Sequence, residues 1–112
     1  MTASLLLRNL GRALVSQGHA ALNITATEVE IVAAPGAGLR LIVLDGEGSA
    51  SAVGTVQWLA GASPLTGADA TGIATVLRVP VIVLPEDTAL IASVTGVGAA
   101  FRGWISYGTV RV

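Results

Sequence analysis

The chain has 112 residues, of which 53% are hydrophobic and 12% charged, and it carries a net charge of −1 and no cysteine. This length fits one domain with its own core, and the absence of cysteine excludes disulfides and thiolate metal sites. Without a run of basic residues, neither a nucleic-acid interface nor a membrane-surface patch is expected. The longest uncharged stretch, Gly48 to Ala68, contains too many glycine, serine and proline residues for a membrane-spanning helix.

The first 20 residues contain a cluster of leucines whose conformation the sequence leaves open. Their spacing allows one face of a short helix, but Gly11 lies inside the pattern and costs a helix about 1 kcal/mol relative to alanine. We expect residues 1–20 to form an extended arm or a short strand, with the short helix as the alternative. As an anchor, or as an arm exchanged between subunits, this segment would make its contacts through Leu5, Leu6, Leu7, Leu10 and Leu14.

Residues 21–112 consist of short β-rich runs separated by turn residues, a pattern typical of a sandwich or barrel. Residues 27–33 alternate with the strand period of two. Residues 39–44 are almost continuously apolar, as in a central strand, and residues 45–49 are expected to end that strand in a turn. The other predicted strands are 52–60, 73–79, 81–84, 88–95 and 101–112, with a loop or short edge segment around Leu65.

Pro80 lies between two of these runs and marks an edge, a bulge or a break, because proline cannot donate to a ladder. The whole pattern predicts an all-β chain: one antiparallel β-sandwich of about seven to eight strands over residues 21–112, preceded by the N-terminal arm.

Residues able to carry chemistry are few. His19 is the only histidine, and its neighbours predict an exposed loop. Catalytic triads and zinc sites normally use one or more histidines held among the other residues of the site. Glu28 and Glu30 fall on one face of a predicted strand, where outward-facing polar residues explain them better than a glycosidase pair does. We therefore expect no enzyme activity.

Two further acidic pairs, Asp45 with Glu47 and Glu86 with Asp87, fall in predicted turns. Calcium takes six to eight oxygen ligands, and no loop of this sequence offers such a run. The glycines around Gly36 fit no phosphate-binding motif. We expect neither a metal nor another cofactor.

Trp58 and Trp104 lie in the middle of predicted strands, which favours packing in the core for both. The alternative is a stacking platform for sugar, which requires exposed indole rings.

Three segments carry a resemblance to a known family. Residues 29–44 contain a strand, the turn A-P-G-A-G and the strand L-R-L-I-V-L. Residues 55–67 contain the strand T-V-Q-W-L and then P-L-T-G. Residues 81–107 contain an apolar strand, an L-P turn, T-A-L and a final G-W-I-S-Y strand.

Over residues 27–112 the chain thereby resembles small phage-encoded β-sandwich virion proteins, the capsid decoration or cement proteins. The resemblance implies a jelly-roll-like fold and a place on the capsid surface after synthesis in the host cytoplasm. It also implies the major capsid protein as a partner and self-association, often as a trimer.

The low content of charged residues is consistent with a decoration protein, because part of the apolar surface of each subunit would be covered by other subunits. We expect a structural protein that bridges major capsid subunits. The alternative is a tail or fibre module that binds host glycans. A small hydrolase is disfavoured by the single histidine and the missing nucleophile motif.

Overall fold

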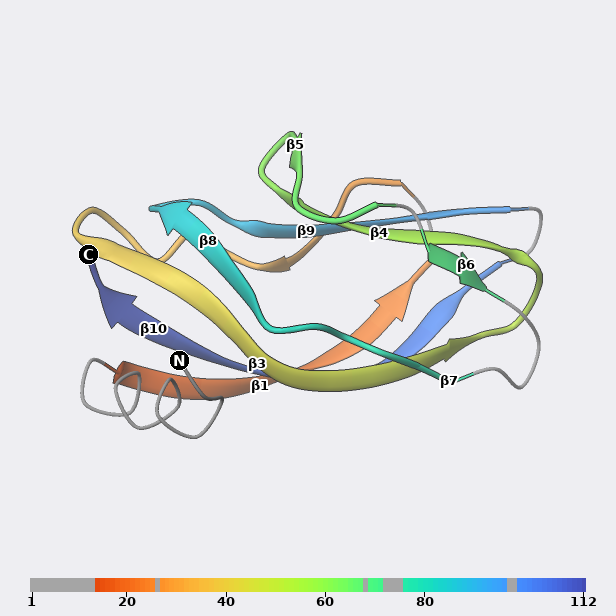
Figure 1. The fold of residues 1–112 in the computed structure, drawn as a ribbon, viewed down its shortest axis with the longest axis horizontal. Helices are drawn as coiled ribbons and strands as arrows, with labels where there is room; N and C mark the ends of the chain where they lie inside the picture. The colour runs from red at the N-terminus through yellow and green to blue at the C-terminus, as the bar shows by residue number, and fades with distance from the viewer. Residues whose placement is uncertain (1–13, 26, 68, 72–75, 97–98) are drawn as a thin grey trace.

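The computed structural model describes residues 14–25, 27–67, 69–71, 76–96 and 99–112. They form ten β-strands in two antiparallel five-stranded sheets, and no helix is found among them. Figure 1 shows the two sheets stacked face to face. The chain is therefore all-β, as the sequence predicts.

Each sheet has three main strands and two short ones that share an edge. In sheet A, the order is β1 (Leu14–Ile24), β10 (Phe101–Arg111) and β3 (Leu39–Ala50), and then, end to end along β3, β7 (Val76–Arg78) and β8 (Ile82–Glu86). In sheet B, the order is β2 (Val29–Val32), β9 (Leu90–Thr95) and β4 (Gly54–Ala60), and then, along β4, β5 (Ser63–Pro64) and β6 (Asp69–Thr71).

The topology is that of a jelly roll. Because β5 and β6 share one position and β7 and β8 share another, the sandwich has four positions in each sheet. The chain changes sheets at nearly every connection, from β1 in sheet A to β2 in sheet B and so on to β10, as in a double Greek key. The predicted β-sandwich is confirmed, and its eight strand positions fall within the predicted range.

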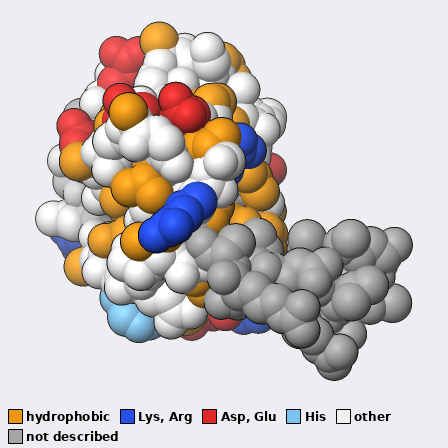
Figure 2. Space-filling view, turned by 90° about the vertical axis from the view of Figure 1, so that its left-hand side faces the viewer, with side chains coloured by type: hydrophobic (Ala, Val, Ile, Leu, Met, Phe, Trp, Pro, Cys, Tyr) orange, Lys and Arg blue, Asp and Glu red, His pale blue; other side chains and the backbone are white. Residues whose placement is uncertain are grey.

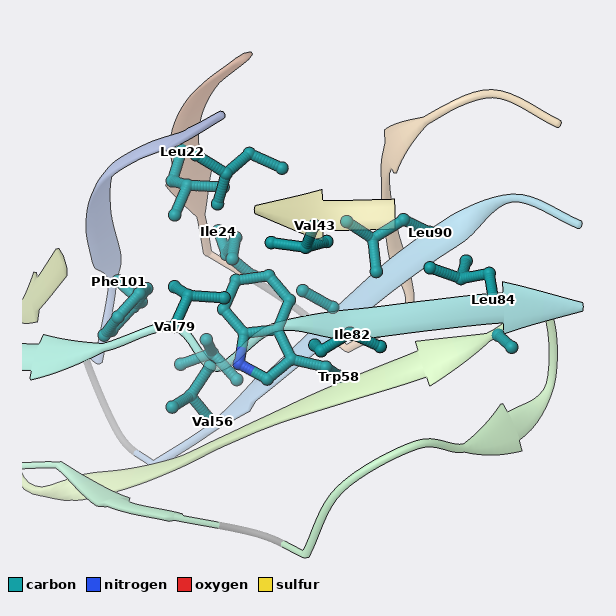
Figure 3. Packing of buried hydrophobic residues seen from close by; sticks show 14 of the residues in the cluster. Leu22, Ile24, Val43, Val56, Trp58, Val79, Ile82, Leu84, Leu90 and Phe101 are labelled. Atoms are coloured by element: carbon teal, nitrogen blue, oxygen red, sulfur yellow. The ribbon is translucent and has the colours of Figure 1, made fainter. Parts of the chain in front are cut away.

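The core lies between the sheets and is aliphatic around two aromatic rings. Trp58 of β4 and Phe101 of β10 meet edge to face, with ring centroids 6.3 Å apart and planes at 82°. Edge-to-face packing of two aromatic rings adds stability beyond that from burying their apolar surface. Figure 3 shows aliphatic side chains from both sheets around the Trp58 indole.

The predicted turn at residues 45–49 is wrong, because β3 continues through it to Ala50. The reason is close packing against β10. A Cβ at Gly46 would lie 2.8 Å from Ile105 Cγ2, and a Cβ at Gly48 would lie 2.5 Å from Phe101 Cε1. In a strand, such glycines mark a place where another group approaches closely. They are needed for packing, not for chain reversal.

The other differences concern the N-terminal part and the turns. His19, expected in a loop, lies within β1 and is exposed. Residues 14–20, expected to form an extended arm or a short strand, form the first part of β1, which continues to Ile24 within the predicted sandwich domain. Glu28 has a φ of 55° and precedes β2, so it does not share a strand face with Glu30. β8 runs through Pro85 to Glu86, and the chain turns at Asp87, whose φ is 47°.

Candidate functional site

The outer face of sheet A carries the most prominent group of exposed functional side chains. Along β10, Phe101 and Ile105 belong to the core cluster, so the residues between them that alternate with this set face outward. Trp104 is one of these and is 40% exposed, whereas Trp58 is 2% exposed. The two tryptophans, which the sequence did not distinguish, therefore have different roles.

A shallow hollow of about 170 Å³ lies beside Trp104, over β3, β7 and β10. Its lining combines one aromatic ring, one aliphatic side chain, polar groups and bare backbone. The lining residues are Glu47, Gly48, Ser49, Val76, Arg102, Gly103 and Trp104. At Gly103 a Cβ would collide with the carbonyl oxygen of Glu47, so the backbones of β3 and β10 approach closely at the hollow.

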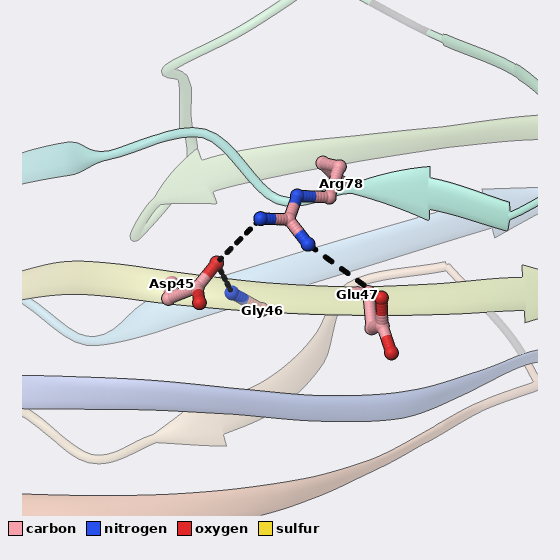
Figure 4. A network of polar contacts seen from close by, with 4 residues as sticks. All are labelled: Asp45, Gly46, Glu47 and Arg78. Carbon is pink, nitrogen blue, oxygen red and sulfur yellow. Dashed lines mark hydrogen bonds and ion pairs between the residues drawn. The ribbon is translucent and has the colours of Figure 1, made fainter.

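Charged side chains lie along one side of this hollow. Arg78 of β7 lies between two carboxylates of β3, with Nη2 4.0 Å from Asp45 Oδ1 and Nη1 3.8 Å from Glu47 Oε2 (Figure 4). Asp45 Oδ1 also accepts a hydrogen bond from the backbone N–H of Gly46, at 2.8 Å. The Arg78 and Asp45 side chains are more than half exposed and Glu47 is partly exposed, and such pairs contribute about 0–1 kcal/mol to stability. Of these three residues, Glu47 lines the hollow.

The opposite side of the hollow is fixed by a hydrogen bond between neighbouring strands. Arg102 Nε of β10 donates to Asn23 Oδ1 of β1, at 3.2 Å. This contact orients the Arg102 guanidinium, which lies in register with Ser49 on β3. The hollow is thus lined by the Trp104 indole, the Glu47 carboxylate, the Arg102 guanidinium and the Ser49 hydroxyl.

His19, Ser106 and Asp45 lie in one cross-strand row of sheet A, a combination that invites comparison with a catalytic triad. His19 is paired with Ser106, and Ser106 with Asp45. In a triad the histidine lies between the nucleophile and the acid, but here Ser106 is the central residue. His19 and Asp45 are two strands apart, which is about 10 Å at 4.7–4.9 Å per strand. This row lacks the geometry for nucleophilic catalysis.

The acidic residues singled out from the sequence do not converge. No group of three or more histidine, cysteine, aspartate or glutamate residues within the described part of the chain is placed to hold a metal ion. Glu86 ends β8, and Asp87 accepts a hydrogen bond from the backbone N–H of Gly36 at 2.9 Å. Asp87 therefore stabilises the turn around it.

Of the leucines predicted to make contacts, Leu14 begins β1 and is half-buried, with its side chain over Gly108. Leu5, Leu6, Leu7 and Leu10 lie outside the described residues. Over the described ranges, no helix is long and apolar enough to span a membrane.

A strip of exposed valines lies on the edge of sheet A formed by β7 and β8. Val76 is 61% exposed, Val81 52% and Val83 50%. We call these three residues the valine strip. Figure 2 shows one end of the molecule, where hydrophobic side chains are scattered among acidic and basic ones.

Sequence reasoning considered Trp104 but did not select the charged residues around it. The signal was present, because F-x-G-x-I from Phe101 to Ile105 alternates with the period of a strand and places Arg102 and Trp104 on the other face. Arg78 became part of the site only through the pairing of β7 with β3.

Comparison with known proteins gives no relative for this arrangement: no family model, no curated protein and no solved structure matches the chain.

Proposed function

We propose that this chain is a non-enzymatic structural protein of a phage virion, which associates with copies of itself and bridges major capsid subunits on the head surface. The proposal rests on the resemblance of residues 27–112 to decoration proteins, together with the jelly-roll fold. A trimer on the capsid surface is the form of assembly that the resemblance implies.

The observation that carries this proposal is the valine strip. Val76, Val81 and Val83 are each at least half exposed along one edge of sheet A. Val81 and Val83 flank the buried Ile82, whereas Val76 lies farther along β3, opposite Ser49. An isolated exposed valine is ordinary, but several exposed valines along one sheet edge are consistent with a protein contact. Only 12% of the residues are charged, so the surface offers little to keep copies apart.

The N-terminal leucines are proposed to anchor the oligomer to the capsid. Because many copies bind the same particle, each contact can be weak while the coat as a whole remains attached. Deleting residues 1–13 keeps all of β1, so the deletion separates anchoring from folding.

The test uses capsids of the encoding phage assembled without this protein. Wild-type protein is expected to sediment with these capsids and to form oligomers in solution. Replacing Val81 and Val83 with aspartate should reduce the oligomer, whereas the exposed Val53→Asp (76% exposed) serves as the matched control. Failure of the wild-type protein to bind capsids would refute the decoration role.

A second candidate function, binding of host glycans by a tail or fibre module, is favoured by the exposed Trp104. An indole beside the Glu47 carboxylate and the Arg102 guanidinium is suited to stack on a sugar ring and to hydrogen-bond its hydroxyls. The hollow of about 170 Å³ is smaller than the roughly 300–1,000 Å³ of sites for drug-sized ligands. It would accommodate one sugar unit of a longer chain.

This second function is tested on a glycan array with wild-type protein and Trp104→Ala. Glycan binding by the wild type that Trp104→Ala abolishes, while circular dichroism stays unchanged, would support it. Arg111→Ala, at an exposed position near the end of β10 and outside the hollow, is the control and should bind normally.

A further inference from the structure

The four sheet edges of this sandwich differ in how well they are protected against pairing with another chain. An exposed edge strand presents unpaired N–H and C=O groups, and natural proteins protect edges with short strands, charges, prolines and bulges. Three of the four edges here have such protection.

The protected edges are short or carry proline or charge. β2 has four residues, with Glu30 exposed. β5 has two residues and includes Pro64, and its neighbour β6 has three, beginning with Asp69. The edge formed by β7 and β8 is interrupted at Pro80 and contains Arg78.

The fourth edge, β1, is different. It has 11 residues, contains no proline, aspartate, glutamate, lysine or arginine, and among the described strands pairs only with β10. Its one irregularity lies at the start, between Leu14 and Ser16. From Ser16 to Ile24 the register with β10 is unbroken, and no other described strand pairs with the opposite side of β1.

The side chains of β1 also place no charged group along this edge. On the core side, Leu22 and Ile24 are buried, and the ring of Tyr107 lies over Gly18, where a Cβ would be 2.7 Å from Tyr107 Cζ. The ring thus fills the space that the glycine leaves. On the outer side, Gln17, His19 and Ala21 are exposed and carry no carboxylate or guanidinium.

We infer that β1 is a self-pairing edge: it binds β1 of a second copy of this chain, antiparallel and across a two-fold axis at His19, so that two A sheets become continuous. This inference rests on the self-association proposed above and names one surface that performs it. It commits to a second copy because the strand is complementary to itself.

An axis through any residue of β1 places like faces opposite each other, and an axis at His19, the middle of Leu14–Ile24, gives the longest overlap. With the axis there, His19 lies opposite His19 of the second copy, and Gln17 lies opposite Ala21 of the second copy. From Ser16 to Leu22 the core-side residues then face core-side residues, and exposed residues face exposed ones. An axis halfway between two residues would instead place core-side residues opposite exposed ones.

A cysteine placed at the axis tests the contact directly, because the native chain has no cysteine. Opposed residues of an antiparallel pair have Cα atoms about 4.5–5.5 Å apart, within the range of about 4.4–6.8 Å that a disulfide spans. Full-length His19→Cys under mild oxidation should give a covalent dimer on a non-reducing gel. It should form about tenfold or more faster than dimers of the exposed Val53→Cys control, because the paired strands raise the local thiol concentration.

Charge substitutions provide a second test that needs no covalent bond. Gln17→Lys with Ala21→Lys places like charges opposite each other across the axis, and Gln17→Glu with Ala21→Glu does the same with opposite sign. Each double variant should lose the β1 contact in analytical ultracentrifugation, while a mixture of the two should recover it. Val53→Lys with Ala62→Lys, at two exposed turn positions, should associate like the wild type.

The outcomes separate this contact from the proposed function. If wild-type oligomers persist in both charge variants and His19→Cys links no faster than Val53→Cys, the β1 contact is refuted, and self-association through another surface stands. If the wild type is monomeric at every concentration, both are refuted. Rapid linking together with recovery in the mixture supports the β1 contact.

Discussion

Replacing Gly48 with alanine tests the explanation given for the glycines of β3. The new Cβ would lie 2.5 Å from Phe101 Cε1 and 2.8 Å from the Arg102 carbonyl oxygen, so the ring and the backbone must both move. Overpacking of this kind costs about 1–3 kcal/mol. The smaller entropy of the unfolded alanine chain offsets about 0.4–1 kcal/mol of that. A net loss of about 1–2 kcal/mol is therefore expected.

The measurement is urea unfolding followed by circular dichroism, compared with Gly67→Ala as the control. No atom lies within 4 Å of a Cβ built at Gly67, so that variant should stay within about 0.5 kcal/mol of wild type. In a Phe101→Leu background the cost at Gly48 should fall, but only in part, because the backbone contact remains. Equal stability of Gly48→Ala and Gly67→Ala would refute the explanation that close packing against β10 requires glycine in this part of β3.

Two further predictions concern the core and one turn. Trp58→Ala should destabilise the protein by about 3–5 kcal/mol, because it empties the centre of the core. Trp104→Ala should cost less than about 1 kcal/mol. Equal losses of stability for the two variants in thermal unfolding would contradict a buried Trp58 and an exposed Trp104. Asp87→Ala should lose about 1 kcal/mol with the hydrogen bond to Gly36, whereas Asp87→Asn, which keeps an acceptor and tolerates the φ of 47°, should be nearly neutral in the same assay.

The sequence predicts the strands well where the side chains alternate. Residues 101–112 were expected to form a strand and β10 covers Phe101–Arg111; residues 52–60 were expected and β4 covers Gly54–Ala60. In both strands, apolar residues recur at every second position because one face of the strand is buried. Short edge strands such as β5 could be placed only as a segment near Leu65, because two residues carry no period.

The failures come from residues whose local preference is overridden by distant contacts. Gly46 and Gly48 have turn propensity, but in the fold Gly46 is opposite Ile105 and Gly48 lies against the Phe101 ring, some 55 residues later in the chain. Gly18 and His19 likewise suggest a loop, yet they lie in a strand in which Tyr107 covers the glycine. No single-sequence pattern encodes these pairings, because they depend on the register between strands far apart in sequence.

The site was predictable to the extent that it depends on a single strand. The alternation from Phe101 to Ile105 already places Trp104 on the polar face, while Val56, Trp58 and Ala60 occupy the core-facing positions of β4. The partners of Trp104 come from β3 and β7, and their approach depends on sheet order. The resemblance to decoration proteins gave the jelly roll but no residue for this hollow.

The two surfaces assigned to association lie at opposite edges of sheet A, since β1 begins the sheet and β7 and β8 end it. A single self-complementary edge can make only a closed dimer. A second contact at the opposite edge allows each subunit to join two neighbours, and a two-fold contact at β1 can then link oligomers built through the valine strip. In the proposed coat, these two contacts together would join neighbouring oligomers. The uncharged β1 and the exposed valines are thus both assigned to the proposed self-association, at opposite edges of one sheet.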